Sequence, residues 1–159
     1  MAKKNKKTNV MRLLDQANIS YTAYDFEKTG ETRGEKVAAL INANPEQVFK
    51  TLVTVAASGQ NYVFDIPVCK ELDLKKAALA VGEKSIHMIP AKDLLALTGY
   101  VHGGCSPIGM KKDFPKVFDM TAQSFESVII SAGKIGHQVQ VQLKDLNQFI
   151  KINYADLIK

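Results

Sequence analysis

The sequence predicts one mixed α/β domain of the α+β type, built on a curved mixed β-sheet. With 159 residues, of which 46% are hydrophobic, the chain can bury one sizeable core but is too short for two ordinary domains. Segments with strand periodicity and segments with helical periodicity follow one another without the regular alternation of a doubly wound parallel sheet. Charged residues make up 23% of the chain and are spread along it, which excludes an intrinsically disordered protein.

Residues 1–8 differ from the rest of the chain in composition. They contain four lysines with no apolar run behind them, so they are predicted to form a basic, flexible N-terminus and not a secretory signal. The folded domain is predicted to span residues 9–159. Lys, Asp, Gly or Pro interrupts every hydrophobic run within roughly ten residues, which indicates a soluble protein without a membrane partner. Cys69 and Cys105 lie far apart and form no CxxC motif, a usage that fits the reducing cytoplasm.

The first half of the chain is predicted to fold as helix, strand, helix and hairpin. Apolar residues at helical spacing predict the helices, and alternating or β-branched residues predict the strands. In order, these elements are a helix from Thr8 or Asn9 to about Gln16, a strand over 19–26, a helix over 35–41, and hairpin strands over 49–56 and 62–68. The turn between the last two strands is predicted at residues 58–61, which are rich in turn formers.

The second half is predicted to be more irregular. Its predicted elements are helices over 73–80, 91–97 and 146–150 and strands over 85–89, 117–120, 127–131 and 138–143. Gly82 and Gly99 follow the first two helices, where a glycine commonly ends a helix. The segment 100–109 holds three glycines and a proline and is therefore interpreted as a structured loop.

The net charge and the positions of histidine and cysteine limit the kinds of partner and site that the sequence can support. A net charge of +5 and a pI of about 9.1 suit a polyanionic partner, but are also common in soluble proteins that bind no nucleic acid. His102 and Cys105 lie three residues apart, yet two ligands do not close a metal site, so neither a metal nor another cofactor is predicted. Cys105 on its tight loop is a candidate nucleophile, although the favoured interpretation is a small, buried and unreactive cysteine.

Two features remain ambiguous when they are interpreted from the residues alone. The loop and the lysines that follow it, Lys111 and Lys112, offer free backbone amides and positive charge, but they match neither the Walker A nor the Rossmann order of glycines. The loop therefore fits a rigid turn as well as a binding site. Lys50 begins a hydrophobic strand, where a lysine either extends to solvent or faces an anion, and solvent is the simpler interpretation.

Four ordered motifs resolve part of this ambiguity. They are Val48–Leu52, Asp73–Ala77, Gly99–Gly109 and Ser131–Gly136. Together they resemble the YbaK family of Cys-tRNA(Pro) deacylases, which is related to the editing domain inserted in bacterial prolyl-tRNA synthetases. The resemblance implies a single domain with a curved, partly barrel-like mixed sheet flanked by helices. It also implies an enzyme that hydrolyses mischarged Cys-tRNA(Pro) in trans, without a metal or a cofactor.

The resemblance also implies a site. Lys50 would hold the 3′-terminal nucleotide, and the backbone of Gly103 and Gly104 would approach the aminoacyl group, so these three are the expected catalytic residues. The expected substrate-binding residues are Tyr24, Thr51, Ser106, Pro107, Ser131, Ala132 and Gly133. Two departures stand out: residues 32–34 replace a Phe-Gly-Asp stretch on one pocket wall, and Gln138 replaces an acidic residue and cannot act as a general base.

The mechanism implied by the resemblance uses a nucleophile from the substrate itself. The thiol of the esterified cysteine attacks its own carbonyl and leaves as a thiolactone. The expected partners are the 3′ end and acceptor stem of tRNA, with Lys111, Lys112 and the N-terminal lysines as contributors, and prolyl-tRNA synthetase. Three alternatives stay open: an Ala-tRNA(Pro) deacylase of the same fold, a non-catalytic module that binds tRNA or the synthetase, and a Cys105 hydrolase unrelated to tRNA.

Overall fold

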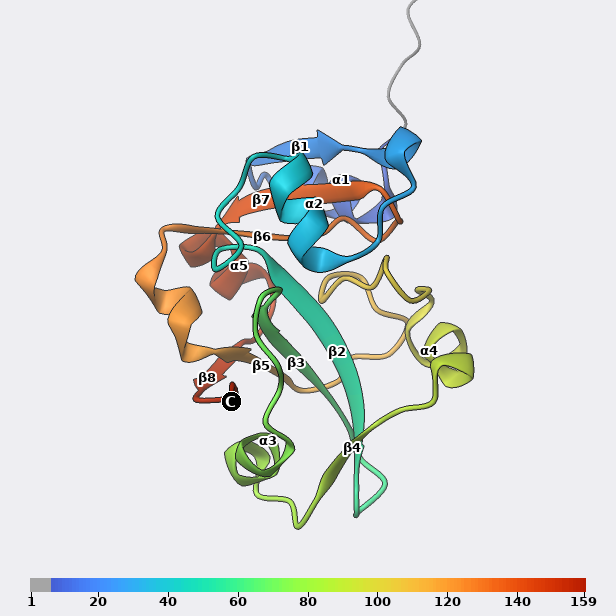
Figure 1. Cartoon of the computed structure of the whole chain (residues 1–159), viewed down its shortest axis with the longest axis vertical. Helices are drawn as coiled ribbons and strands as arrows, with labels where there is room; N and C mark the ends of the chain where they lie inside the picture. Colours follow the sequence, from blue (N-terminus) through green and yellow to red (C-terminus); the bar gives the residue numbers. More distant parts are fainter. Residues whose placement is uncertain (1–6) are drawn as a thin grey trace, which may run out of the picture.

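The computed structural model describes residues 7–159, and its strands form two sheets (Figure 1). The smaller, antiparallel sheet has the order β1 (Tyr21–Asp25), β7 (His137–Gln142), β6 (Ser127–Ser131). The larger, mixed sheet has the order β4 (Ile86–Met88), β2 (Phe49–Ala56), β3 (Asn61–Pro67), β5 (Lys116–Asp119), β8 (Asn153–Ala155). The helices are α1 (Asn9–Gln16), α2 (Gly34–Leu40), α3 (Leu74–Val81), α4 (Ala91–Thr98) and α5 (Leu143–Phe149), with 3-10 turns at Glu27–Thr29 and Met120–Ser124.

The predicted mixed α/β class is confirmed, and the expected single sheet is divided in two. A parallel bridge between Val48 and Ile129 joins the start of β2 to β6, and the Ile129 amide donates to the Gln47 carbonyl at 3.1 Å. The two sheets therefore curve around a shared interior without closing into a barrel in the described chain.

The β2–β3 hairpin is the longest regular feature, and its prediction is confirmed. The strands pair antiparallel from Phe49 opposite Pro67 to Val55 opposite Asn61. One face of the hairpin is apolar toward α3, through Phe64 and Ile66. The other face joins the main core, so both faces are buried for much of their length, which explains the near-continuous run of apolar residues.

The helix ends agree with the expected capping residues. Thr8 Oγ1 accepts a hydrogen bond from the Met11 amide at the start of α1, and Asp73 Oδ1 accepts from two amides at the start of α3. Gly82 and Gly99 end α3 and α4 in the left-handed conformation. Of the predicted basic, flexible segment 1–8, residues 1–6 lie outside the described residues, whereas Thr8 is fixed as a helix cap.

Two elements near the C-terminus differ from the expectation. Helix α5 begins at Leu143, not at Leu146, because β7 runs directly into it: Gln142 is both the last residue of β7 and the N-cap of α5, and the Leu143 amide still donates to the Glu126 carbonyl at 2.8 Å in register with the β6–β7 ladder. Strand β8 was not predicted. Its three residues pair in parallel with β5, a contact between distant segments that leaves no periodic pattern in so short a stretch.

Part of the β2 edge has no partner strand within the described residues. Strand β4 pairs only with Thr54–Ala56, and the Ile89 amide adds one bond to the Val53 carbonyl. Between this pairing and the bridge from Val48 to β6, the edge of β2 around Thr51 is therefore left free on the side of α4 and the loop 100–109 (Figure 1). No helix in the described part of the chain has the length and apolar character to cross a membrane.

Candidate functional site

A pocket of about 450 Å³ lies against the free edge of β2. Five consecutive residues, Phe49–Val53, line it. Successive side chains of a strand point to opposite faces, so a pocket on one face meets only every second residue. Contact with all five indicates that the pocket reaches the edge of the strand as well as a face of it.

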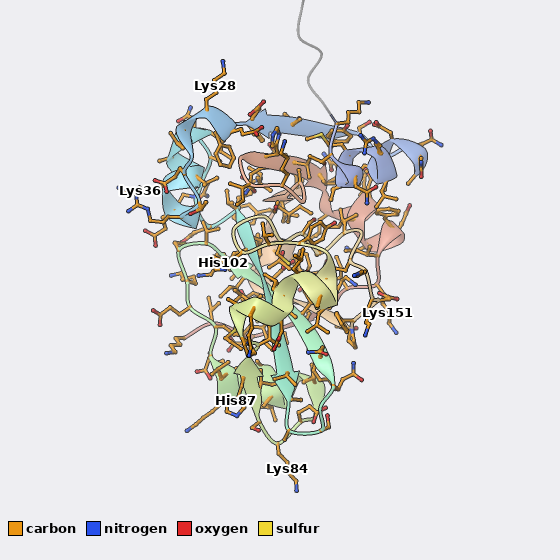
Figure 2. All side chains as sticks on the ribbon, turned by 90° about the vertical axis from the view of Figure 1, so that its right-hand side faces the viewer. Lys28, Lys36, Lys84, His87, His102 and Lys151 are labelled. Atoms are coloured by element: carbon orange, nitrogen blue, oxygen red, sulfur yellow. The ribbon has the colours of Figure 1, made fainter. Side chains whose placement is uncertain are left out.

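Segments from all parts of the chain close the other walls. The lining residues outside β2 are Phe26, Glu31, Thr32, Arg33, Gly34, Val37, Val68, Met88, Ile89, Ala91, Leu94, His102, Gly103, Cys105, Ser131 and Gln138. Figure 2 looks onto the face that carries α4, with His102 near its middle and Lys84 at the far tip of the molecule. The lining contributed by α4 and the segment before it is apolar, whereas Lys50, Thr51 and residues 31–33 contribute polar groups.

Lys50 is the cation of this pocket that is free to meet an anion. It is half-buried, and within residues 7–159 its ammonium group has no carboxylate partner. Arg33, by contrast, is held by Glu31 through bonds of 2.9 and 3.1 Å. The Arg33 side chain lowers the pKa of Glu31 to about 2, so this carboxylate stays charged and cancels the arginine. The local excess of positive charge therefore belongs to Lys50.

The loop 100–109 is held rigidly against the turn that follows β6. A Cβ atom on Gly104 would lie 2.9 Å from the Ile135 nitrogen and 3.2 Å from the Lys134 carbonyl carbon, so only glycine permits this backbone contact. The Tyr100 hydroxyl donates to the Ile108 carbonyl and closes the loop on itself. The loop prediction is confirmed, and Gly103 reaches the pocket as a consequence of this packing.

Four of the ten expected site residues line the pocket: Lys50, Thr51, Gly103 and Ser131. They come from two β-strands and one loop that are far apart in sequence. Lys50 and Gly103, which the sequence places 53 positions apart, thus share one cavity.

The other expected residues surround the pocket without lining it. The Gly104 amide already donates to the Val101 carbonyl at 3.0 Å, so it is not a free donor. Ser106 is fully buried and accepts from the Ile108 amide at 3.2 Å, next to the buried Pro107. These contacts hold the loop in its conformation, so the three residues support the pocket wall without meeting the ligand.

Ala132, Gly133 and Tyr24 also lie behind the wall. Ala132 is fully buried, and a Cβ on Gly133 would lie 2.9 Å from the Tyr100 ring. The Tyr24 hydroxyl donates to the Gln140 side chain at 2.7 Å, on the side of the small sheet that packs against α2. Sequence motifs could not separate lining from supporting residues, because both kinds are constrained by the same close packing.

Cys105 lines the pocket but is not poised as a nucleophile. Its side chain is 8% exposed, and burial, followed by the nearby Asp65 carboxylate, raises the pKa of its thiol to about 12. The reactive form of cysteine is the thiolate, and sites that activate a cysteine lower the pKa of its thiol so that more of the thiolate is present. His102 also lines the pocket, as an exposed residue. The favoured interpretation of a buried, unreactive thiol fits this environment.

Asp25, Glu27 and His137 form a cluster that the sequence did not reveal. One ligand atom from each lies within 4.8 Å of the others. The His137 ring nitrogen bonds Glu27 Oε2 at 2.8 Å, and Lys134 lies 3.4 Å from the same carboxylate. The hydrogen bond from His137 is the largest cause of the lowered pKa of Glu27. The Glu27 carboxylate is thus paired with Lys134 and hydrogen-bonded to His137, which links the turn after β1 to β7.

Comparisons relate the chain to known proteins. The family model of the aminoacyl-tRNA editing domain matches residues 29–149. A protein of Enterococcus faecalis (strain ATCC 700802 / V583) with the provisional name Cys-tRNA(Pro)/Cys-tRNA(Cys) deacylase EbsC is 45% identical over 160 residues, covering 99% of this chain and 98% of the relative.

Two solved structures share the fold. The hypothetical protein APE2540 is 21% identical with a TM-score of 0.85, over 94% of this chain and 99% of that one. A protein described as a provisional trans-editing enzyme for prolyl-tRNA synthetase is 23% identical with a TM-score of 0.80, over 97% of this chain and 99% of that one.

The contact at Gly104 gives a first prediction. A Gly104→Ala variant places a methyl group against the main chain of the facing turn, and overpacking of this kind costs about 1–3 kcal/mol of unfolding free energy. Amide hydrogen exchange over 100–109 is expected to rise as well. In the control Gly59→Ala, the methyl group meets no atom within 4 Å, and the substitution strains only its own turn at φ 89°, so exchange in the loop 100–109 should stay unchanged. Wild-type exchange in Gly104→Ala would contradict the contact.

The environment of Cys105 gives a second prediction. At pH 8 the half-buried Cys69 should react with iodoacetamide at least about tenfold faster than Cys105, whose thiolate is scarce below its pKa of about 12. Mass spectrometry of timed samples measures both rates, and protein unfolded in urea should label equally at both sites. Equal rates in the folded protein would restore Cys105 as a candidate nucleophile.

Proposed function

The chain belongs to the family of aminoacyl-tRNA editing domains, and from that premise we propose that it hydrolyses mischarged Cys-tRNA(Pro) in trans. The name of its Enterococcus relative, which it matches along nearly its whole length, supports a Cys-tRNA substrate. We assign the activity to residues 9–159 as one deacylase domain. The Ala-tRNA(Pro) and binding-module alternatives are treated as outcomes of the experiments below.

The observation that carries the proposal is the shared pocket of Lys50 and Gly103. An aminoacyl-tRNA presents a phosphodiester, a ribose and an ester within a few bonds of one another. An unpaired ammonium suits the phosphate, and a nearby backbone without a side chain suits close approach to the ester. The exposed edge of β2 between them supplies further main-chain donors and acceptors along the same wall.

The bound cysteine supplies the nucleophile. Its sulfur forms a bond to the carbonyl carbon, the ester C–O bond breaks, and the thiol proton ends on the departing ribose oxygen. The products are tRNA with a free hydroxyl and a cysteine thiolactone, which water then opens to cysteine. No protein nucleophile is required, in agreement with the protonated, buried thiol of Cys105.

The protein contributes orientation and electrostatic stabilisation. Holding the ester so that sulfur and carbonyl meet removes an entropic barrier that can amount to several kcal/mol. Gly103 lies on the pocket wall in the left-handed conformation at φ 87°. Its backbone is the group of the loop that we assign to stabilising the negative charge on the carbonyl oxygen during the reaction. Gln138 faces the same space, and its amide cannot remove a proton. Rapid reaction is therefore confined to amino acids with an internal nucleophile.

Cleavage by the substrate's own thiol selects cysteine over other amino acids more strongly than the size of a pocket can. A size difference of one small group is worth about 1–3 kcal/mol, which is too little for reliable editing. Alanine and proline esters have no thiol, so they can occupy the pocket without being cleaved by this route.

Binding of tRNA is proposed to be largely electrostatic. Lys111 and Lys112 are exposed directly after the loop that carries Gly103, where they can meet the acceptor stem. The predicted contribution of the N-terminal lysines concerns Lys7 and residues outside the described chain, and Lys7 already pairs with Asp15 at 2.6 Å. Prolyl-tRNA synthetase is the proposed partner that delivers the mischarged tRNA.

The role of Lys50 is directly testable. Loss of a charged hydrogen bond is worth about 1.5–3 kcal/mol, so Lys50→Ala should lower kcat/KM for Cys-tRNA(Pro) by about tenfold to hundredfold. The control Lys84→Ala removes the same charge at the far tip of the molecule (Figure 2) and should retain wild-type activity. If both variants retain full activity, Lys50 has no part in the reaction.

Substrate chemistry separates the alternatives. Cys-tRNA(Pro) should be deacylated, whereas S-methylcysteinyl-tRNA(Pro), Ala-tRNA(Pro) and Ser-tRNA(Pro) should remain largely intact, because only the first carries a free thiol. Quenched reactions resolved by acid gel electrophoresis measure the loss of each ester. Faster cleavage of Ala-tRNA(Pro) would establish the alanine alternative, and tRNA binding without cleavage of any ester would establish the binding module.

A further inference from the structure

Buried polar atoms without partners gather around this pocket. Within residues 7–159, the buried side-chain oxygens that lack a hydrogen-bond partner are Thr51 Oγ1, both carboxyl oxygens of Asp65, and Gln138 Oε1. Thr51 and Gln138 line the pocket. Buried polar groups are normally paired, since an unpaired one costs folding free energy. Thr51 and Gln138 therefore bring unpaired hydrogen-bonding groups to the cavity, and Asp65 brings a third to the layer behind it.

Asp65 lies directly behind Thr51. The two residues are opposite one another in the β2–β3 register, so their side chains share one face of the hairpin at a Cβ separation of about 5 Å. Asp65 is completely buried. Cys105 from the loop and Lys116 from β5 are close enough to interact with it electrostatically. Asp65 thus sits one layer below the pocket surface, with Thr51 and Cys105 between it and a ligand.

The neighbours of Asp65 do not neutralise it as an ion pair. Lys116, 6% exposed, instead bonds Asp113 at 3.1 Å and the Phe114 carbonyl at 3.0 Å. Burial raises the pKa of Asp65 to about 8, and the Thr51 hydroxyl and the positive charge of Lys116 offset only part of that effect. The carboxyl therefore holds a proton at neutral pH and has an O–H to donate.

We propose that Asp65 is a positioning residue that sets the direction of the Thr51 hydroxyl. As the neutral acid, Asp65 donates its proton to Thr51 Oγ1, which leaves the Thr51 proton for an oxygen of the bound aminoacyl-ribose. As the anion, it accepts that proton, so Thr51 turns a lone pair toward the same oxygen and repels it. This inference rests on the proposed function, because it names the group that Thr51 binds.

The sign of the pH dependence follows from this arrangement. The contribution of Thr51 to deacylation is greatest when Asp65 is protonated, and it falls as the pH rises through the Asp65 pKa of about 8. The folded state also binds this proton more tightly than the unfolded chain, where the ordinary value is 3.8. The contribution of Asp65 to stability is therefore greatest at low pH and declines as pH rises from about 4 to about 8.

Asp65→Asn tests the inference, because a carboxamide of the same shape donates at every pH. After subtraction of spontaneous ester hydrolysis, wild-type kcat/KM on Cys-tRNA(Pro) should fall about tenfold at pH 9 relative to Asp65→Asn, since one unit above the pKa leaves about a tenth of the acid form. Urea unfolding provides a readout without substrate: the decline in stability with pH should be smaller in Asp65→Asn.

Threonine variants provide a second, independent arm. Thr51→Val removes the hydroxyl and should abolish the fall in activity above pH 8, in the presence or absence of Asp65→Asn. Thr54→Val is the matched control, because its buried hydroxyl on the same strand bonds the Tyr62 carbonyl, and it should keep the wild-type pH profile.

The outcomes distinguish the two proposals. If wild-type protein cleaves Cys-tRNA(Pro) but shares its pH profile with Asp65→Asn and Thr51→Val, the role of Asp65 is overturned and the deacylase function stands. If wild-type protein cleaves no aminoacyl ester, both are overturned. Should Asp65→Asn fail to fold, the comparison of Thr51→Val with Thr54→Val decides the matter.

Discussion

The backbone contact between two glycine-rich loops is the constraint on which the pocket depends. At Gly104 the loop 100–109 touches the main chain of Lys134 and Ile135 with no room for a Cβ atom. Gly133 and Gly136 face Tyr100 and Glu27 in the same way, at 2.9 and 2.5 Å for a built Cβ. Because these positions exclude larger residues, the loops meet in one arrangement, and Gly103 is held opposite the free edge of β2. Three of the ten glycines are thus explained by packing that supports the site.

The charged groups of the pocket differ in whether they are free to bind a ligand. Arg33 is cancelled by Glu31, whereas Lys50 keeps its charge for a ligand. Below the surface, burial keeps Asp65 neutral up to a pKa of about 8 and keeps the Cys105 thiol protonated. The pocket therefore presents a cation, hydroxyl groups and backbone groups, and the Cys105 thiol in its lining is protonated. Such an inventory suits an enzyme that orients a self-reacting substrate.

The order of the elements could largely be predicted from sequence, because the relevant information is local. The helix cap at Thr8, the cap at Asp73, the glycine ends of α3 and α4, and the β-branched hairpin each follow from the preferences of adjacent residues. Where local patterns were weak, the prediction failed: β8 exists because β5 pairs with it, and α5 starts early because β7 runs into it without a loop. Motif resemblance extended the prediction to Lys50, Thr51, Gly103 and Ser131, but could not tell them from supporting neighbours such as Ser106 and Ala132.

By itself, the sequence determined the α/β class, most element boundaries and the family, since these depend on periodicity, capping and ordered motifs along the chain. Only the tertiary structure decided which residues meet in the pocket, that the sheet divides in two, and that β2 keeps a free edge. It also decided the state of Asp65, an isolated carboxylate in an apolar strand of unremarkable pattern. The physical reason is that desolvation and close approach depend on neighbours from β2, β5 and the loop 100–109, which no local stretch of sequence contains.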